Sequence, residues 1–548
     1  MPEASRQCGM CAYPLVAAAT AGICCALHAN QTWPVVAGAP SHHGVSNSIA
    51  LPHGNAPAEA TLAPAWITST DEHGRPFAAI AAQTPTFDDQ RVYISARVTT
   101  QAGPQWRLLA VERSGGTATW SSPISPPLVD SFSSATVDSN RGQVIIASGR
   151  DVVCFDAQSG AQTWSRRLAR NVVNASPVIA DDVEGRARAF ITDYDGFGQA
   201  ASLYCINIDE HSDDNPFDPG EVIWSVLIGG ASGATPAFLP ACDGGTGLVY
   251  VATRGEPSFV PGTILAFDAY ANNSPSPAFI THNAIDEGFY GTISIEPPSN
   301  QSVHPTLYAV SYEFYGGLAS ANLIAVDGVT GSVRWSMPSN RGASAPVLLG
   351  NGRIAVSAGV QGYGTLPSVA LYLDRKDHAL ELWNIVRDSW TDHNNDHVID
   401  PDECDSVGLW SYQPIASSDL RLLSVGVAPE SASVGAFGPS MATLDVALAP
   451  WDRTFTHRTA GISGSPSAGR GCFYAINASG LVAFAMPRID VNSDGRATID
   501  DLCTFERGNA SNNRRDVTGD GTVNGTDRAT LLGQLRVHEA GRMSAGRN

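Results

Sequence analysis

Short apolar segments, each followed by a polar turn and then by a tryptophan, recur through the middle of the chain. The clearest copies are VVCFDAQSGAQTW, which ends at Trp164, and NLIAVDGVTGSVRW, which ends at Trp335. The apolar segments have the length and the β-branched content of strands. The Asp-x-x-x-Gly segment that follows is typical of a tight hairpin in which glycine adopts a positive φ. The pattern therefore predicts pairs of antiparallel strands.

Weaker copies show that the pattern is a repeat. They end at Trp120, Trp224 and Trp383, another surrounds Asp268, and CFYAINASGLVAF (472–484) lacks the tryptophan. A segment with a small residue and then proline precedes several copies, as NASPVIADD, GATPAFLPA, ASAPVLLGN and ISGSPSAGR. A unit of about 50 residues that supplies four short strands has the size of a propeller blade.

Stacking such units around an axis explains how they bury their apolar faces. A four-stranded blade cannot cover both of its faces alone, whereas neighbouring blades cover one another. We therefore predict an all-β fold, a β-propeller of eight blades, with seven blades as the alternative. The last repeat stops after GLVAFAMP and lacks an outer strand. We expect APAWITST (63–70), which contains Trp66, to supply that strand and close the ring.

The composition agrees with strands and turns and excludes one class of partner. The 548 residues include 53 Gly and 35 Pro, and only 16% are charged. The formal net charge is −20, so no basic surface is expected that would neutralise the phosphates of a nucleic acid.

The first residues resemble a secretion signal. Arg6 precedes the apolar stretch AYPLVAAATAGICCALHA, and a cut after Ala29 would leave a small residue at the cleavage position. A lipoprotein is the alternative because Cys24 and Cys25 lie here, although the residues before them fit a lipobox poorly. No second apolar run of about 18 residues follows. We expect an exported protein, extracellular, at the cell surface or periplasmic, that is not integral to a membrane.

The repeats and the segment WPVVAGAPSHHGVS (33–46) resemble the quinoprotein-like propellers over roughly residues 33–487. That family contains dehydrogenases that hold pyrroloquinoline quinone and calcium in the tunnel, and non-catalytic members such as the outer-membrane assembly lipoprotein. The dehydrogenases stack the quinone on a disulfide between adjacent cysteines. The only adjacent pair here, Cys24–Cys25, lies in the expected signal, and no CxxCH haem motif is present. The resemblance therefore favours the non-catalytic members, and we expect no quinone.

Two segments near the C-terminus match the twelve-residue calcium loop. They are DVNSDGRATIDD (490–501) and DVTGDGTVNGTD (516–527), with oxygen ligands expected at positions 1, 3, 5, 7, 9 and 12 and glycine at 6. The expected ligands of the first loop are Asp490, Asn492, Asp494, the Arg496 carbonyl, Thr498 and Asp501. Those of the second loop are Asp516, Thr518, Asp520, the Thr522 carbonyl, Asn524 and Asp527. Each loop brings three carboxylates, so we predict two calcium ions.

Each loop leads into a helix-like segment, DLCTFERG and DRATLLGQLRVHEA. Aspartate at position 12, a following helix and the duplication resemble type I dockerins. The resemblance implies a cohesin-like or cell-surface partner, recognised through positions 10 and 11, here Ile499–Asp500 and Gly525–Thr526. The expected domains are a signal peptide (1–29), a quinoprotein-like propeller (30–487) and a small α-helical, dockerin-like calcium domain (488–548).

A third, degenerate loop lies within the propeller, at DHNNDHVIDPDE (392–403). His397 stands where glycine is expected, at a cost of about 1 kcal/mol for a left-handed backbone. The candidate ligands are Asp392, Asn394, Asp396, the Val398 carbonyl, Asp400 and Glu403. The alternative is an acidic surface insertion without a metal ion.

The sequence contains no obvious catalytic set. We found no Ser/His/Asp or Cys/His arrangement, and His42, His43 and His53 lack metal-ligand spacing. The catalytic residues stay unknown, and an enzyme is the less favoured reading. We expect a binding, display or scaffold module held through its C-terminal domain, with an unknown ligand at the propeller. The first alternative is a carbohydrate-active protein, which needs a carboxylate pair facing the tunnel. The second is a quinone-dependent oxidoreductase.

Overall fold

The computed structural model falls into two compact units, Met1–Asn30 and Gln31–Asn548, and only residues of the second are described here. The described residues are 34–46, 64–128, 131–181, 183, 185–194, 200–230, 232–241, 246–254, 262–282, 288–299, 302–312, 321–360, 366–390, 392, 394–398, 400, 403–404, 406–427, 440–446, 454–457, 464–469, 472–477, 480–485, 499–508, 515, 517, 523, 525, 527–532 and 535. The signal predicted at 1–29 lies outside them.

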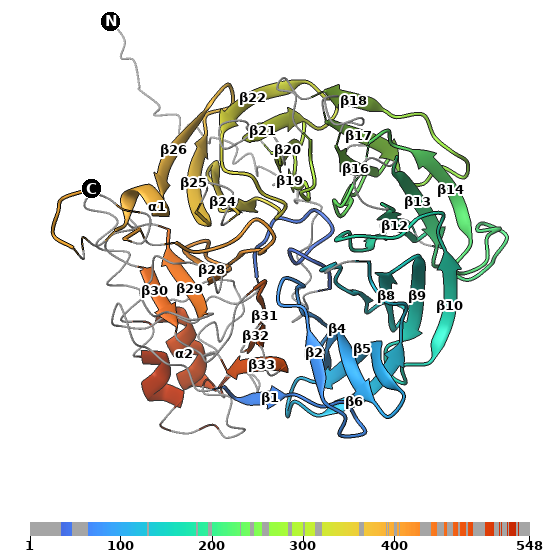
Figure 1. Cartoon of the computed structure of the whole chain (residues 1–548), viewed down its shortest axis with the longest axis horizontal. Coiled ribbons are helices and arrows are strands. Elements are labelled where there is room, and N and C mark those ends of the chain that lie inside the picture. The colour runs from blue at the N-terminus through green and yellow to red at the C-terminus, as the bar shows by residue number, and fades with distance from the viewer. Residues whose placement is uncertain are drawn as a thin grey trace, which may run out of the picture. The chain divides into compact units, whose positions relative to one another are not determined.

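Eight antiparallel sheets surround a central axis, and each sheet is one blade (Figure 1). The strands of blade 1 are β2 (Phe77–Ala79), β3 (Thr86–Phe87), β4 (Arg91–Thr100), β5 (Gly103–Glu112) and β6 (Ala118–Pro123). Blade 2 has β7 (Thr136–Asp138), β8 (Gln143–Ser148), β9 (Asp151–Asp156) and β10 (Gln162–Arg167). Blade 3 has β11 (Val178–Ala180), β12 (Arg188–Thr192), β13 (Ser202–Asn207) and β14 (Val222–Leu227). Blade 4 has β15 (Ala237–Leu239), β16 (Leu248–Thr253), β17 (Thr263–Asp268) and β18 (Phe279–His282).

The remaining four blades follow the same order, from an inner to an outer strand. Blade 5 has β19 (Ser294–Glu296), β20 (Thr306–Val310), β21 (Asn322–Asp327) and β22 (Val333–Pro338). Blade 6 has β23 (Val347–Leu348), β24 (Arg353–Ala358), β25 (Ser368–Asp374) and β26 (Ala379–Asn384). Blade 7 has β27 (Ile415–Ala416), β28 (Leu422–Val427), β29 (Ser440–Asp445) and β30 (Thr454–His457). Blade 8 has β31 (Ser467–Gly469), β32 (Cys472–Asn477), β33 (Gly480–Ala485) and β1 (Trp66–Thr68).

The outer strand of blade 8 comes from the N-terminal side of the ring. Strand β1 pairs antiparallel with β33, with Trp66 opposite Ala483 and Thr68 opposite Leu481. The indole nitrogen of Trp66 donates a hydrogen bond to the carbonyl of Arg113, at 2.9 Å. Both the eight-bladed propeller and its closure by the segment 63–70 are therefore confirmed.

The repeated tryptophans pack between neighbouring blades, as predicted. Trp120, on β6, lies with its ring centroid 6.0 Å from that of Tyr93 and 6.2 Å from that of Phe155 in the next blade. The glycine of the adjoining hairpin lies directly against this indole. A Cβ at Gly160 would come within 2.5 Å of the Trp120 ring, and the φ of Gly160 is +71°. Glycine is required here both for the backbone conformation and for the close approach.

Two short helices belong to other parts of the chain. Helix α1 (Ile385–Asp388) follows β26 and is capped by Asn384, whose side chain accepts a hydrogen bond from the Val386 amide. Helix α2 (Ile499–Arg507) coincides with the predicted helical segment after the first C-terminal loop. Within the described part of the chain, no helix is long and apolar enough to cross a membrane.

Candidate functional site: the axial channel

The segment of residues 34–46, called the N-terminal segment below, lies across the inner strands near the axis (Figure 1). These strands expose unpaired backbone groups toward the axis, and the segment pairs with those of five blades. The amides of Val137, Phe238, Ile295, Leu348 and Ala416 donate to the carbonyls of Pro34, Pro40, Ser41, His43 and Gly44, respectively, at 2.7–3.0 Å. The N-terminal segment therefore ties together blades 2, 4, 5, 6 and 7.

His42 anchors the middle of this segment. Its side chain is fully buried, and its Nδ1 lies 3.2 Å from the Ile293 carbonyl, to which it donates in the matching tautomer. The backbone carbonyl of His42 accepts a hydrogen bond from the Ser294 hydroxyl, at 2.9 Å. Burial lowers the pKa of His42 to about 3, so the imidazole is neutral at ordinary pH. Neither this role nor that of the segment was visible in the spacing of the histidines.

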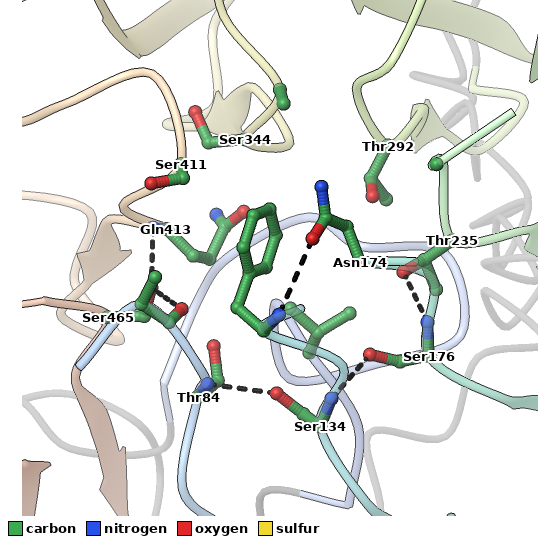
Figure 2. Close-up of a pocket in the computed structure, with 15 residues that line it drawn as sticks. Thr84, Ser134, Asn174, Ser176, Thr235, Thr292, Ser344, Ser411, Gln413 and Ser465 are labelled. Atoms are coloured by element: carbon green, nitrogen blue, oxygen red, sulfur yellow. Dashed lines mark hydrogen bonds between the residues drawn. The ribbon is translucent and has the colours of Figure 1, made fainter. Parts of the chain in front are cut away.

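A ring of small polar side chains links the blades around the channel (Figure 2). The residue before the first strand of a blade carries a hydroxyl that accepts the amide proton of the equivalent residue in the preceding blade. The amides of Thr84, Ser134 and Ser176 donate to the hydroxyls of Ser134, Ser176 and Thr235, respectively, at 2.9–3.0 Å. Thr84, Ser176 and Thr235 each precede a proline, as the small residues of the repeats do, whereas Ser134 precedes Ala135. Three of the four positions were therefore visible in the sequence, and their connection was not.

Gln413 stands in blade 7 at the position that carries the hydroxyl in the first four blades. Its side-chain oxygen accepts the amide of Ala345, the equivalent residue of blade 6, at 2.8 Å. The side-chain nitrogen of Gln413 donates back to the Ala345 carbonyl, at 3.2 Å. The amide of Gln413 in turn donates to the Ser465 hydroxyl, at 3.0 Å. The polar ring is thus continued by side chains of different length.

The space inside this ring is small. The channel cavity has a volume of about 20 Å³ open to water, which is room for roughly one or two water molecules. Its lining is Val36, Ala82, Thr84, Phe132, Ser134, Asn174, Ser176, Gly233, Thr235, Thr292, Ala343, Ser344, Ser411, Gln413 and Ser465. None of these lining residues carries a charge. The described lining can exchange hydrogen bonds but offers no acid or base for catalysis.

Aromatic rings lie next to the channel cavity. Phe132, which lines the cavity, contacts Trp410 at 5.8 Å between ring centroids, and Trp410 contacts Tyr312 at 5.4 Å. Tyr312 continues the contact to Tyr290, at 5.5 Å. Burial raises the pKa of the Tyr290 phenol, which also accepts a hydrogen bond from the Arg254 guanidinium at 2.7 Å. These rings join blades that are distant in the sequence.

Most of the predicted C-terminal calcium ligands lie outside the described residues. These are Asp490, Asn492, Asp494, Arg496, Thr498, Asp516, Thr518, Asp520, Thr522 and Asn524. The two position-12 aspartates, Asp501 and Asp527, are described, and both are fully buried. Asp501 lies in the first turn of α2, and residues 527–532 are helical as well. A small apolar core of Phe505, Val517, Leu531 and Leu535 holds these two helical segments together.

The third loop, 392–403, is a turn held together by its own carboxylates where it is described. The carboxylate of Asp392 accepts the amides of Asn395 and His397, and that of Asp396 accepts the amide of Val398. Glu403 is buried and accepts the amides of Asn394 and Asp400. His397 adopts the left-handed conformation expected of glycine, with φ +60°. Within the described residues, however, no three acidic, histidine or cysteine side chains lie close enough together to hold a metal ion.

Comparisons with known proteins agree with this geometry. The family model described as "Outer membrane protein assembly factor BamB" matches residues 74–224 and 105–257, together about a third of the chain. Over this stretch the repeats of this chain are similar to those of that family. None of the curated proteins matches it.

Solved structures of low sequence identity are similar to this chain. The quinohemoprotein alcohol dehydrogenase of Comamonas testosteroni is 11% identical with a TM-score of 0.56, over 83% of this chain and 77% of the dehydrogenase. BamB of Moraxella catarrhalis is 14% identical with a TM-score of 0.43, over 77% of this chain and 99% of BamB. Sqt1 of Saccharomyces cerevisiae is 12% identical with a TM-score of 0.48, over 81% and 100% of the two chains. The likeness to the dehydrogenase supports a quinoprotein-like propeller fold and says nothing about function or ligand.

Proposed function

We propose that the protein is an exported, non-catalytic propeller that acts as a binding, display or scaffold module. The observation that carries this proposal is the narrow axial cavity among the described residues. The quinoprotein dehydrogenases that the repeats resemble hold their cofactor in the tunnel, and here the cavity bounded by the described inner residues is about 20 Å³. A planar tricarboxylate needs an aromatic platform and cationic partners. The described lining offers one aromatic ring, Phe132, and no cation.

The alternatives need features that the described channel does not offer. A carbohydrate-active protein acting in the tunnel needs two carboxylates that flank the scissile bond. No carboxylate lines the described cavity. A quinone-dependent oxidoreductase needs a much larger space on the axis. Both alternatives are therefore weaker than a module that presents its outer surfaces to a partner.

In this proposal the C-terminal domain binds two calcium ions through the two predicted loops. Support comes from the places of Asp501 and Asp527, which are buried in two helical segments at the predicted twelfth position of each loop. A carboxylate at position 12 of such a loop binds the calcium ion directly. The third loop, 392–403, is the candidate for a further ion, with its described carboxylates closing around it on binding.

The domain then docks on a cohesin-like or cell-surface partner. The residues at positions 10 and 11 of the first loop are at the surface: Ile499 is 56% exposed and Asp500 is exposed. Ile499 is a single exposed apolar side chain at the start of α2, not an apolar patch. Its exposure is compatible with the docking role that the dockerin resemblance implies.

Calcium titration of the full-length protein tests the proposal. After dialysis against chelator, calorimetry should show two tight sites, and a third if loop 392–403 also binds. Asp501→Asn and Asp527→Asn should each remove one tight site, because the amide keeps the shape and loses the charge. Chelator should release the protein from the cells that secrete it, and so should the two substitutions made together. Immunoblots of the cell-associated and released fractions measure this.

Asp500→Asn is the matched control, because Asp500 is the exposed neighbour of Asp501 and is not a predicted ligand. It should keep the stoichiometry of calcium binding. An absence of calcium-binding heat, or cell association that is indifferent to chelator, would contradict the proposed attachment.

A further inference from the structure

An acidic insertion joins the third and outer strands of blade 3. It is the segment 208–221 between β13 and β14, whereas the equivalent strands of blade 2, β9 and β10, are joined by 157–161 alone. The insertion contains no lysine or arginine. Its acidic residues are Asp209, Glu210, Asp213, Asp214, Asp218 and Glu221. Negative charge is therefore concentrated at the outer part of this blade.

Two asparagine side chains hold the insertion in a fixed shape. The side-chain amide of Asn207 donates to the carbonyls of Asp209 and Phe217, at 2.8 Å each. The side-chain amide of Asn215, a residue that is fully buried, donates to the carbonyl of Glu210, at 3.0 Å. Because these bonds fix the backbone, the carboxylates of the insertion are positioned before any ligand arrives.

The insertion also contacts blade 2. The Nε of Arg166, on β10, donates to the carbonyl of Gly220, at 2.7 Å. Arg141, in the turn between β7 and β8, forms an ion pair with Asp209. The two blades thus hold the insertion across their seam.

A cavity of about 720 Å³ lies at this seam. Its volume is within the range of ligand sites. It shares no lining residue with the axial cavity. The charged or titratable residues of its lining are Arg141, Asp156, Asp209, Glu210 and His211. Most of the acidic lining comes from the insertion.

The one guanidinium of this lining is already neutralised. Arg141 forms ion pairs with Asp138, Asp181 and Asp209, the first two at 3.1 and 3.0 Å. Three carboxylates therefore compensate one positive charge, and Arg141 does not make the cavity attractive to an anion.

Asp156 and Glu210 add two more negative charges to the cavity. Hydrogen bonds from Ser159 hold the pKa of the Asp156 carboxyl below its ordinary value, so it is ionised at neutral pH. Glu210 is exposed. The charges of this cavity therefore favour a cation.

The spacing of the carboxylates favours an organic cation over a metal ion. Among the described residues, no three acidic, histidine or cysteine side chains are close enough together to hold a metal ion. A lysine or arginine side chain carries its charge on a long stem and presents several donors, so it can reach carboxylates that are well separated. The exposed Asp213, Asp214 and Asp218 continue the negative charge along the insertion, which suits a segment with several basic residues.

We propose that the cavity between blades 2 and 3 binds a basic segment of a partner protein. A lysine or arginine side chain of that segment enters the cavity and donates to Asp156 and Glu210. This site rests on the binding role proposed above for the propeller and gives the partner a defined chemistry. The calcium and chelator experiments test the C-terminal domain instead, so the two proposals can fail separately.

Fluorescence anisotropy of labelled hexalysine and hexaarginine with the full-length protein tests the site at about 0.15 M salt. At least one of the two peptides should bind to saturation, and hexaglutamate should not bind. Asp156→Asn combined with Glu210→Gln should weaken binding about tenfold or more, because charge-assisted hydrogen bonds are lost. Glu210→Lys alone should weaken it as much and should leave the melting temperature unchanged, because this side chain is exposed.

Asp377→Asn combined with Asp500→Asn is the matched control. It removes the same two charges from exposed positions in the hairpin before β26 and in α2. Peptide affinity should be unchanged, since neither residue belongs to the cavity.

The proposal would be wrong if neither basic peptide bound at about 1 mM, where even millimolar affinity is detectable. Equal weakening by the two pairs of substitutions would also overturn it, because the attraction would then belong to the net charge of −20 and not to the cavity. Binding of spermine that the cavity substitutions weaken, without binding of either peptide, would assign the cavity to a small amine and contradict a protein partner.

Discussion

His42 shows how much the closure of the channel depends on a single residue. It adopts a left-handed backbone, with φ +54°, and its imidazole is fully buried with Nδ1 on the Ile293 carbonyl. Burial lowers its pKa from 6.5 to about 3. Protonation of the buried imidazole is therefore unfavourable and opposes the packing of the N-terminal segment on the inner strands.

We predict that acid destabilises the propeller through this residue. Because the folded pKa is below the unfolded one, the stability due to His42 is fully present above about pH 6.5 and is lost as the pH falls toward 3. His42→Asn should flatten the decline in melting temperature between pH 6.5 and pH 4. Asparagine tolerates the left-handed backbone, can donate to the Ile293 carbonyl and does not titrate there.

His378→Asn serves as the comparison, because His378 is exposed on the hairpin before β26. The melting temperature of His378→Asn should decline with pH as that of the unmodified protein does. If the melting temperature of His42→Asn declines equally, the acid sensitivity has another source.

The hairpin glycines show what the sequence reveals at this scale. The Asp-x-x-x-Gly spacing correctly predicts a positive φ, as at Gly160 and Gly331. It does not reveal that a Cβ at Gly331 would come within 2.5 Å of Phe279 in the preceding blade. Backbone conformation is encoded within a few residues, whereas the partner that a turn contacts is set by packing between repeats.

Strand β1 is the element on which the closure of the ring depends. Its tryptophan fills the position that Trp120 occupies in blade 1 and packs on Tyr474, at 5.9 Å between ring centroids. The sequence predicted this strand because the last repeat lacked an outer strand and a tryptophan-containing segment was left over. The N-terminal segment escaped prediction, since 34–46 has no periodicity and bonds to five different blades.

We predict that Trp66→Ala weakens the seam between blades 8 and 1. The substitution removes the indole bond to Arg113 and a large apolar contact, and should lower the melting temperature by about 5 °C or more. An exposed edge at β33 should also promote aggregation. Trp390→Ala is the control, because that side chain is 40% exposed and lies outside the blades. Equal melting temperatures for the two variants would show that β1 does not hold the ring shut.

At the scale of the whole molecule, the ring brings together residues that no local pattern connects. The fold follows from a repeat of short strands, so both the blade number and the closure could be read from the chain. The channel could not, because Thr84, Ser134, Thr235 and Gln413 come from four different blades. The C-terminal loops are the opposite case: their predicted calcium ligands lie within twelve residues of one another, so the prediction needs the sequence alone.

The central claim is that the axial cavity among the described residues is too small for a cofactor and that the protein binds without catalysis. Mixing the full-length protein with calcium and pyrroloquinoline quinone, followed by dialysis, tests this claim most directly. Absorbance should show no retained quinone, because a cavity of about 20 Å³ without a lining cation cannot hold it. Dye reduction across a panel of alcohols and sugars should stay at background. A retained chromophore near one per chain, or dye reduction that depends on the quinone, would contradict the account.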